Sequence, residues 1–564
     1  MIVLGIHDGH DAGACLFQDG RILCVSSEER RRNSKNFAGV PERSIEAVFR
    51  FTGVRPKDVD LVALAGRIRT TKPTRGEKPI YKVLRAMYSV ARTEVMTKVG
   101  QWALAKVRKR SELLKYLAEA GLAEVPMRAY DHHLTHAATA YFHRPWTGDA
   151  TVLTLDGGGD GLCATVSVGR GTRLEVVSRT PKFHSIAAYL YSAITELLGM
   201  KPYEHEYKLM GLAPYGQHER SAEIFRSMFR VDGLSFHNDG GKIGPAVLAE
   251  FAKRLRGHRF DDIAAGCQKV FEELLVAWVG NAVRHTGIRD VAAAGGAFLN
   301  VKANKLVRES GDAGRLFVYP ACDDGGTPAG AAILAYLELS EERGARPALE
   351  LPRDMYLGLS HDEKEMERTL QGSGFPFSRP EAVDTEAAGH LARGEIVACF
   401  RGREEYGPRA LGNRSILADA RELRSVRKLN FAIKHRDFWM PFAPSILEED
   451  AGHYLKNLGP WPFWMVEAFD TTPDAWKDIA AALHPFDLTA RPQVLNGLNP
   501  DYQRLVRETK RLTGVGALLN TSFNLHGFPI VGHPDTALDT FARSDIDALV
   551  LGPFLVRKSN GART

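Results

Sequence analysis

A β-hairpin is encoded near the start of the chain by Val3-Leu-Gly-Ile-His-Asp-Gly-His-Asp-Ala-Gly-Ala-Cys-Leu-Phe17. Aliphatic and β-branched residues fill both arms, and glycine and aspartate, which favour turns, lie between them. A second segment repeats the pattern as Val152-Leu-Thr-Leu-Asp-Gly-Gly-Gly-Asp-Gly-Leu-Cys-Ala-Thr-Val-Ser-Val168. The copies are too widely spaced for a solenoid, so the repeat predicts a duplicated domain with a ligand between its halves.

A third glycine-rich segment supports this interpretation. It reads as strand, double glycine and helix in Asp290-Val-Ala-Ala-Ala-Gly-Gly-Ala-Phe-Leu-Asn-Val-Lys-Ala-Asn304. Glycine lets backbone N–H groups approach phosphate oxygens, helix starts attract anions, and aspartate can hold a metal that bridges phosphates. Each turn alone is also explained as a plain tight turn, but the three in this order resemble the α/β fold of actin, sugar kinases and the Hsp70 ATPase.

Length and composition indicate a soluble protein with more than one domain. The chain has 564 residues, of which 44% are hydrophobic and 25% charged, and one hydrophobic core rarely serves a chain of this length. No apolar run approaches membrane-spanning length, and the start becomes polar too early for a signal peptide. The six cysteines show no CxxC spacing, which argues against a zinc module or disulfide framework. We therefore expect a cytoplasmic protein that does not bind membranes.

The charged, proline-bearing stretch 341–353 is a plausible linker. It separates an N-terminal domain, 1–340, from a C-terminal α/β domain, 354–564. Within the second domain we expect a helix over 363–372, a strand over 396–400, and a final part over 515–556.

Basic residues concentrate between positions 67 and 110, where thirteen lysines and arginines stand against two glutamates. Helical spacing over 81–110 predicts a basic amphipathic helix. Such a helix can bind nucleic acid or an anionic surface, guard an anionic substrate, or be a solvated flank. The stretch is left unassigned.

A metal site is indicated by Asp131-His132-His133-Leu134-Thr135-His136. On a helix, residues four apart share a face, so His132 and His136 can reach one metal. Asp156 at a strand end and Asp324 can complete the ligand set, although Asp156 can equally cap its turn. Two imidazoles with two carboxylates suit Fe(II), Mn(II) or Zn(II) with open positions for phosphate or water.

Long motifs then carry a family resemblance. They are Gly9-His10-Asp11, the HxxxH pair, Glu206-Tyr-Lys208-Leu-Met-Gly-Leu-Ala-Pro-Tyr-Gly216, Gly295-Gly296, Asp324-Gly-Gly326, Tyr406-Gly-Pro-Arg-Ala-Leu-Gly-Asn-Arg-Ser-Ile-Leu417, Lys434-His-Arg436, Pro441-Phe-Ala-Pro444, Leu519-Asn-Thr-Ser-Phe-Asn524 and Pro529-Ile-Val531. Together they resemble the NodU/CmcH family of O-carbamoyltransferases across nearly the whole chain, and most closely its antibiotic-tailoring members.

The resemblance implies two linked activities. The N-terminal domain is expected to be similar to tRNA threonylcarbamoyl transferases and to bind Fe(II), or Mn, Zn or Mg, together with a nucleotide. The C-terminal domain is expected to be YrdC-like and to make carbamoyl-AMP from carbamoyl phosphate and ATP. The metal ligands would be His132, His136, Asp156 and Asp324, with Asp323 the alternative to Asp324. Nucleotide or cofactor contacts would come from Lys35, Asp160, Lys208, Gly295, Gly296, Asn300 and Asn304.

Making carbamoyl-AMP brings two polyanions together, so that site needs cations. Arginine binds phosphate with two parallel donors, and lysine acts as a compact charge. Surface ion pairs are the alternative, but they suit poorly arginines set among Gly, Pro, Ala and Leu. The candidates are Arg409 and Lys434 as catalytic groups, with Arg414, Arg436, Arg491, Asn520, Ser522 and Asn524 as binding groups.

In the transfer step His10 is the expected base for the acceptor hydroxyl, with Asp8 nearby, because an imidazole titrates near neutrality. The acceptor would be a small-molecule alcohol, such as an aminoglycoside, a polyketide, a cephem or an oligosaccharide. Two alternatives stay open: a tRNA threonylcarbamoyl transferase, and a small-molecule kinase or ATPase of the same fold. Nucleic acid is not the expected partner, and a homodimer is the expected assembly.

Overall fold

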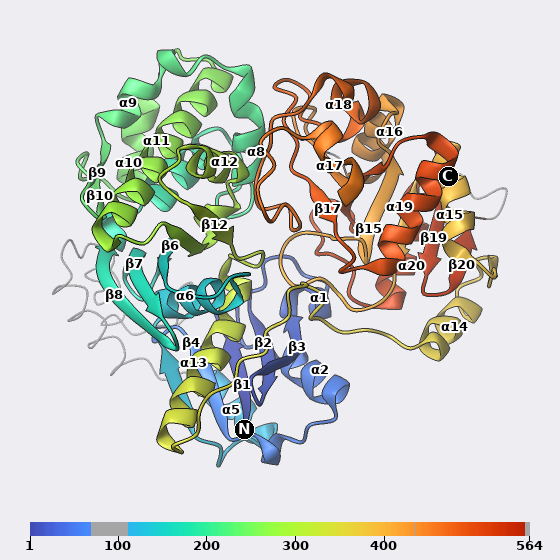
Figure 1. Ribbon diagram of the computed structural model, residues 1–564, viewed down its shortest axis with the longest axis horizontal. Helices are drawn as coiled ribbons and strands as arrows, with labels where there is room; N and C mark the ends of the chain where they lie inside the picture. Colours follow the sequence, from blue (N-terminus) through green and yellow to red (C-terminus); the bar gives the residue numbers. More distant parts are fainter. Residues whose placement is uncertain (69–110, 435, 559–564) are drawn as a thin grey trace. The chain divides into compact units, whose positions relative to one another are not determined.

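The computed structural model describes residues 1–68, 111–434 and 436–558. The chain divides into two compact units, each described by itself (Figure 1). The first unit comprises residues 1–28 and 36–353, and the second comprises residues 29–35 and 354–564. Apart from residues 67 and 68, the basic stretch 67–110 lies outside the described residues.

Two five-stranded sheets build the first unit, in the orders β3-β2-β1-β4-β5 and β8-β7-β6-β11-β12. In each sheet the central strand pairs antiparallel with the hairpin strand that follows it and parallel with the strand on its other side. Because strand order and direction match, the predicted duplication and the actin-like α/β fold are confirmed. The strands are β1 (Ile2–His7), β2 (Gly13–Gln18), β3 (Arg21–Ser27), β4 (Leu61–Ala65), β5 (Met127–Tyr130), β6 (Ala150–Gly159), β7 (Leu162–Arg170), β8 (Arg173–Pro181), β11 (Asp290–Ala294) and β12 (Arg315–Val318).

Two helices pack against each other, and each also packs on one of these sheets. Helix α13 (Thr327–Glu342) packs on β1, β2 and β4, helix α6 (His132–His143) packs on β6, β7 and β11, and the two helices pack on each other. Glycine permits their close approach, because a Cβ on Gly330 would lie 2.0 Å from the carbonyl oxygen of Thr135. The contact fixes the start of α6 relative to the start of α13.

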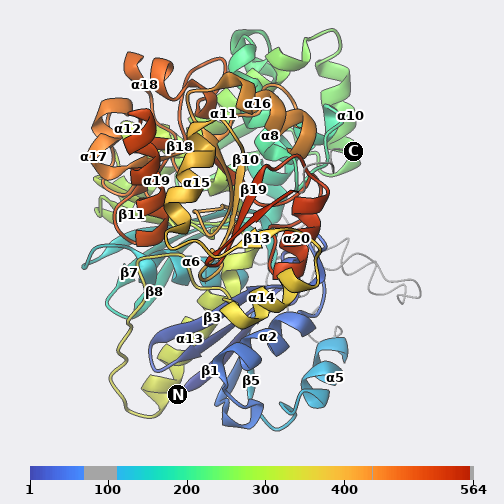
Figure 2. The same ribbon diagram turned by 90° about the vertical axis from the view of Figure 1, so that its right-hand side faces the viewer.

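Further helices of the first unit cover the outer faces or carry connecting loops (Figures 1 and 2). Helix α2 packs on β2 and β3, and the long α11 packs on α8, α9 and α12. The elements are α2 (Glu42–Thr52), α5 (Ser111–Glu119), α7 (Ala193–Leu197), α8 (Glu206–Leu212), α9 (Ala222–Arg226), α10 (Pro245–Arg254), α11 (Phe260–Thr286), α12 (Val301–Glu309), and the small sheet of β9 (Phe229–Asp232) and β10 (Ser235–Asn238).

An eight-stranded mixed sheet organises the second unit, in the order β13-β20-β19-β14-β15-β18-β16-β17. The strands are β13 (Phe377–Ser378), β14 (Val397–Phe400), β15 (Arg414–Asp419), β16 (Ala443–Leu447), β17 (Gln493–Leu495), β18 (Ala517–Ser522), β19 (Ala548–Leu551) and β20 (Phe554–Arg557). The helices are α14 (Glu363–Gln371), α15 (Val383–Ala392), α16 (Leu423–Lys428), α17 (Glu448–Tyr454), α18 (Pro473–Asp478), α19 (Pro500–Thr513) and α20 (Pro534–Ala542).

Both faces of this sheet are buried. Along β14, Val397 and Cys399 join a core that includes α15 and α19, whereas Ala398 and Phe400 join the core that includes α14 and α20. Alternate residues of a strand point to opposite faces, so an unbroken apolar strand is what a doubly covered sheet requires.

One segment departs from a simple N-to-C division. Residues 29–35, most of which belong to α1 (Glu28–Arg32), form part of the second unit. Arg30 and Arg31 both contact the buried carboxylate of Glu404. The stretch expected as a linker begins inside α13, and the backbone of Glu350 bonds to that of Gly20 in the first unit.

No helix in the described parts of the chain combines the length and apolar character needed to cross a membrane.

Candidate metal centre and cation cluster

Helix α6 carries two histidines, four residues apart, at its N-terminal end. The side chain of Asp131 caps the helix by accepting a hydrogen bond from the amide of Leu134, which fixes where the helix begins. His132 and His136 follow at helical spacing and are 4% and 0% exposed. The predicted shared face of the HxxxH pair is therefore observed.

Two aspartates from other elements complete the constellation. Asp156 lies in β6, and Asp324 starts the short turn that leads into α13. Nε2 of His132 lies 3.3 Å from Asp156 Oδ2 and 3.3 Å from Asp324 Oδ1, and Nε2 of His136 lies 3.3 Å from the same Asp324 oxygen. One ligand atom from each of the four residues lies within 4.8 Å of the others.

This donor set fits a divalent metal ion. The two Nε2 atoms are only 3.2 Å apart, and a divalent cation between them and the two carboxylates would satisfy all four groups. Burial alone lowers the pKa of His132, but Asp324 and Asp156 raise that pKa well above its ordinary value. The same histidines in turn hold the pKa of Asp324 well below its usual range, against the effect of burial. The pocket thus stabilises positive charge, and His132, His136, Asp156 and Asp324 would hold the ion.

The geometry bears on two questions from the sequence: whether Asp323 or Asp324 faces the site, and whether Asp156 caps its turn or faces the histidines. Asp324, and not Asp323, lies in the constellation. Asp156 combines both roles expected for it, because its Oδ1 accepts a hydrogen bond from the Gly157 amide at 2.7 Å while its Oδ2 faces His132.

Neighbouring groups hold these ligands in place. Asp160 accepts hydrogen bonds from the amides of Arg67, Ile68 and His132, each at 2.8 Å, so its carboxylate positions the start of α6. His133 contacts the hydroxyl of Thr154 at 2.8 Å beneath the site. A Cβ on Gly296 would lie 3.1 Å from Asp156 Oδ1, so the double-glycine loop runs against the metal ligands.

A second site consists of cations in the second unit. Lys434 is 3% exposed, and burial, together with the charges of Arg436 and Lys35, lowers its pKa well below the usual value. Burial and the charges of Arg409 and Arg436 do the same to the pKa of Arg491. We call Lys35, Arg409, Lys434, Arg436 and Arg491 the cation cluster. The charges of Lys35, Arg409 and Arg436 each lower the pKa of Lys434 or Arg491, and such a group of like charges favours a polyanionic ligand.

The members of the cluster differ in how they are held. Nζ of Lys434 donates to backbone and side-chain oxygens of Ser522 and Asn524, including Asn524 Oδ1 at 2.7 Å. Among the described residues, buried Nη1 of Arg491 has no hydrogen-bond partner. A buried guanidinium donor without a partner points to an anion.

Arg414, expected as a phosphate ligand, is instead enclosed. It is 0% exposed, donates to the carbonyls of Arg401 and Asn413 at 2.6 and 3.0 Å, and stacks 3.8 Å from the ring of Phe400. Burial lowers its pKa to about 10, despite the charges of Glu404 and Glu405. These contacts assign Arg414 to holding the loop, while its predicted contact with phosphate stays a prediction.

Comparison with known proteins identifies the family. Residues 2–333 match the family model "Carbamoyltransferase N-terminus", and residues 388–558 match "Carbamoyltransferase C-terminus". The chain belongs to the carbamoyltransferase family. Nodulation protein NolNO of Sinorhizobium fredii is 31% identical over 97% of this chain and 79% of its own length. An uncharacterised protein of Methanocaldococcus jannaschii is 30% identical over 99% of this chain and 100% of its own.

Solved structures add little beyond this. Component A of the (R)-2-hydroxyglutaryl-CoA dehydratase of Acidaminococcus fermentans matches 60% of the chain and 99% of its own length, with 17% identity and a TM-score of 0.34. A likeness at that score carries no argument about function.

His10 of this carbamoyltransferase lies within the electrostatic reach of Asp324 and Asp156. Its Nδ1 is 2.7 Å from Asp11 Oδ2. Burial lowers its pKa, but the Asp11 hydrogen bond and charge outweigh burial and raise the pKa to about 9. The hydrogen bond to Asp11 favours the protonated imidazole, so the expected base role requires that this bond be released.

The remaining predicted contacts in the first unit lie around α8 and α12. Asn300 caps α12 and exchanges two hydrogen bonds with the amide of Gln268, each 3.0 Å long. Asn304 donates to the carbonyl of Phe298 at 2.7 Å, and Lys208 lies on α8. Lys35, expected beside the first-domain nucleotide, belongs to the second unit. Their nucleotide contacts stay predictions.

Two residues near the metal centre were not anticipated from the sequence. Nε2 of His7 lies 3.7 Å from Asp324 Oδ2, and burial lowers the pKa of Lys182 although the charges of Asp156 and Asp324 raise it. His7 lies two residues before the Gly9-His10-Asp11 motif, so a search of the residues flanking that motif would have found it. Lys182 stands outside every motif.

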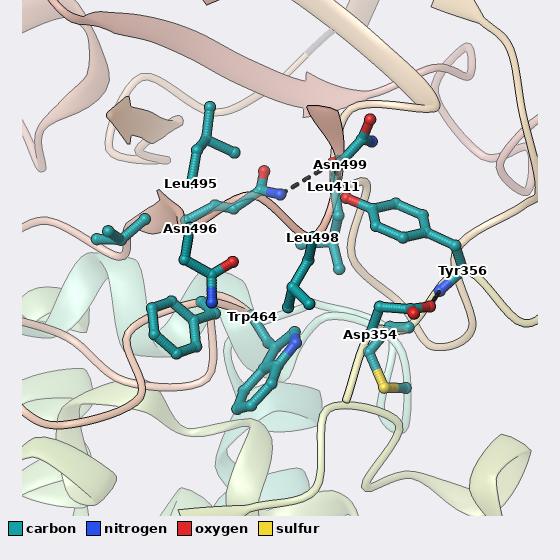
Figure 3. A pocket seen from close by; sticks show the side chains of 12 residues that line it. Asp354, Tyr356, Leu411, Trp464, Leu495, Asn496, Leu498 and Asn499 are labelled. Carbon is teal, nitrogen blue, oxygen red and sulfur yellow. Dashed lines mark hydrogen bonds between the residues drawn. The ribbon is translucent and has the colours of Figure 1, made fainter. Parts of the chain in front are cut away.

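The second unit also contains a small hollow, lined by Trp464, Tyr356, Leu498 and their neighbours (Figure 3). Gln493 lines it and donates to the carbonyl of Leu411 at 2.9 Å. Asn520 donates to the hydroxyl of Ser445 at 3.0 Å, which in turn donates to Gln493 Oε1 at 3.0 Å. Gln493 and Leu411 are each two residues along the chain from a cluster arginine, so the same two chain segments contribute to the hollow and to the cation cluster.

Proposed function

We propose that this carbamoyltransferase carbamoylates a hydroxyl of a small-molecule natural product in two half-reactions. In the first, carbamoyl phosphate, ATP and water give carbamoyl-AMP, pyrophosphate and phosphate. In the second, the alcohol attacks the carbamoyl carbon, and AMP leaves. In carbamoyl-AMP the leaving group is AMP, and contacts to its nucleotide provide binding energy that positions the carbamoyl carbon for attack.

The observation that carries the proposal is the cation cluster with its buried, unpartnered Arg491 donor. Two polyanions repel each other, so their reaction requires cations that are already gathered before the substrates bind. A sugar kinase needs no such second unit. We assign polyphosphate binding to Arg409, Arg436, Arg491 and Lys35, with Lys434 held by Ser522 and Asn524.

We assign the adenosine end of ATP to the surface around the hollow of Figure 3, which is itself too small to enclose a base. Its walls are aromatic and aliphatic, with asparagine amides at the edge, and planar bases stack on such walls while amides bind their edges. On this assignment Trp464→Ala raises the KM for ATP and leaves that for carbamoyl phosphate unchanged.

The second half-reaction is assigned to the first unit. A divalent ion held by His132, His136, Asp156 and Asp324, with Fe(II) expected, would stabilise negative charge on phosphate oxygens. His10 would accept the hydroxyl proton once its bond to Asp11 is released, and Asp8, 2% exposed beside it, would orient the site. An aminoglycoside, polyketide, cephem or oligosaccharide alcohol is the proposed acceptor.

The proposal is tested with the full chain, ATP, carbamoyl phosphate and a panel of such alcohols. We expect pyrophosphate release that requires carbamoyl phosphate, and a carbamoylated alcohol detected by mass spectrometry. ATP turnover at the same rate with and without carbamoyl phosphate would instead support a kinase or ATPase. Salt-sensitive binding of tRNA, with none of the alcohols carbamoylated, would support the threonylcarbamoyl-transferase alternative.

A further inference from the structure

A second group of potential metal ligands lies in the second unit, on the face formed by the starts of two helices. His361 directly precedes the cap of α14, Glu365 is in the first turn of α14, and His533 caps α20. One ligand atom from each lies within 4.8 Å of the others. We call these three residues the α14–α20 cluster.

Hydrogen atoms on His361 can be placed from its contacts. Nε2 of His361 lies 3.1 Å from the carbonyl oxygen of Gly532, and because a carbonyl only accepts, Nε2 carries a hydrogen. In a neutral ring Nδ1 then has a lone pair. That lone pair faces Glu365 Oε2 at 3.0 Å, which is also an acceptor, so a cation or a proton must lie between them.

His533 meets the other oxygen of the same carboxylate. Its Nε2 lies 3.1 Å from Glu365 Oε1, and the two imidazole rings stand nearly perpendicular with centroids 4.9 Å apart. Its Nδ1 lies 3.1 Å from Asp535 Oδ2 and accepts a weaker bond from the Asp535 amide at 3.4 Å. With a metal on Nε2, Nδ1 would donate to the Asp535 carboxylate instead.

Each histidine therefore has one nitrogen turned toward Glu365 and the other beside an oxygen acceptor. Metal-binding histidines have this arrangement, because a carbonyl or carboxylate on the far nitrogen fixes the ring and increases its basicity. Two imidazoles and one carboxylate, with a remaining position for water, form a donor set that suits Zn(II).

The α14–α20 cluster is open to solvent on one side and anchored in the core on the other. The side chain of His361 is 8% exposed and packs on Phe400 of β14, whereas those of Glu365 and His533 are 32% and 43% exposed. One ligand is thus anchored in the core, and the other two face solvent from which an ion can enter.

We propose that the α14–α20 cluster binds Zn(II) as a site separate from the His132–Asp324 centre. The ion would tie α14 to α20 and close the loop 523–533. The other end of that loop follows Ser522 and includes Asn524, the two residues that hold Lys434. This proposal does not depend on the proposed function.

Zinc uptake by the chelator-treated full chain tests it, measured by equilibrium dialysis, with thermal unfolding as the second readout. We expect Glu365→Gln and His533→Gln each to weaken one class of zinc site at least about tenfold and to remove part of the zinc-induced rise in the unfolding temperature. Glu365→Gln keeps the shape of the side chain, and circular dichroism without metal verifies that both variants fold.

The matched control is His453→Gln, which alters an exposed histidine that also lies beside two carboxylates, Asp474 and Asp478, but belongs to no three-ligand group among the described residues. It should bind zinc as the unaltered chain does. Equal uptake by all variants would show that a proton holds the cluster and would overturn the proposal, as would an equal loss in His453→Gln.

Discussion

At the scale of single residues, the same side chain serves different purposes according to what surrounds it. The sequence predicts a phosphate contact for both Arg414 and Arg491. In the structure, however, Arg414 donates its hydrogen bonds to main-chain carbonyls, including that of Gly402 at 3.2 Å. Nη1 of Arg491 has no partner among the described residues. The sequence proposes both arginines as phosphate ligands, but only their contacts distinguish an arginine that holds a loop from one that can bind a ligand.

Arg414→Lys should therefore destabilise the protein, because lysine cannot reach several carbonyls in a plane or stack on Phe400 as a guanidinium does. We expect a loss of about 2 kcal/mol, seen as a lower midpoint in thermal unfolding. Arg491→Lys should leave that midpoint unchanged and instead raise the KM for carbamoyl phosphate or ATP. Equal midpoints for the two variants would contradict the assignment.

The pair of His10 and Asp11 makes a prediction about pH. Asp11 raises the pKa of His10 to about 9, so Asp11→Asn should return that pKa toward its ordinary value. If His10 is the base, its deprotonated form then persists to lower pH, and the acidic limb of the pH–rate profile moves down. An unmoved limb, with normal product formation, would remove His10 from the base role.

At the scale of elements, the metal centre depends on how closely α6 and α13 approach. The ligands come from the start of α6, from β6 and from the turn before α13, so no single element builds the site. Gly330 lets α13 lie against the backbone of Thr135, next to His136. The position of Asp324 relative to His136 follows from this contact.

Gly330→Ala tests that dependence. The added Cβ would lie 2.0 Å from a backbone oxygen, so the helices must separate, at a cost of about 1–3 kcal/mol. We expect reduced metal content by elemental analysis as well as a lower unfolding temperature. Gly452→Ala is the control, because no atom lies within 4 Å of a Cβ on that helical glycine, and it should be neutral or slightly stabilising.

At the scale of the whole molecule, local patterns predicted a large part of the architecture. Alternating apolar residues and Gly–Asp turns were sufficient for both hairpins, and helical spacing was sufficient for His132 and His136. Those patterns could not predict contacts between residues that lie far apart in the sequence. The membership of residues 29–35 in the second unit depends on Arg30 and Arg31 contacting Glu404, more than 370 residues away in sequence. The enclosure of Arg414 likewise depends on packing against Phe400.

The α14–α20 cluster illustrates the same limit. Its histidines stand 172 positions apart (533 − 361), and neither belongs to a spacing motif. Helix starts bring them together, and the carbonyl of Gly532 fixes one ring. Such a site is found only from coordinates.

The central claim is that the two units divide the two half-reactions, and paired variants of the full chain test it most directly. Pyrophosphate release and carbamoylated product are measured in parallel for Arg491→Ala and His136→Ala. We predict that Arg491→Ala loses pyrophosphate release by about 100-fold or more, whereas His136→Ala keeps it and loses the carbamoylated product. Loss of pyrophosphate release in His136→Ala, or its persistence in Arg491→Ala, would contradict the division.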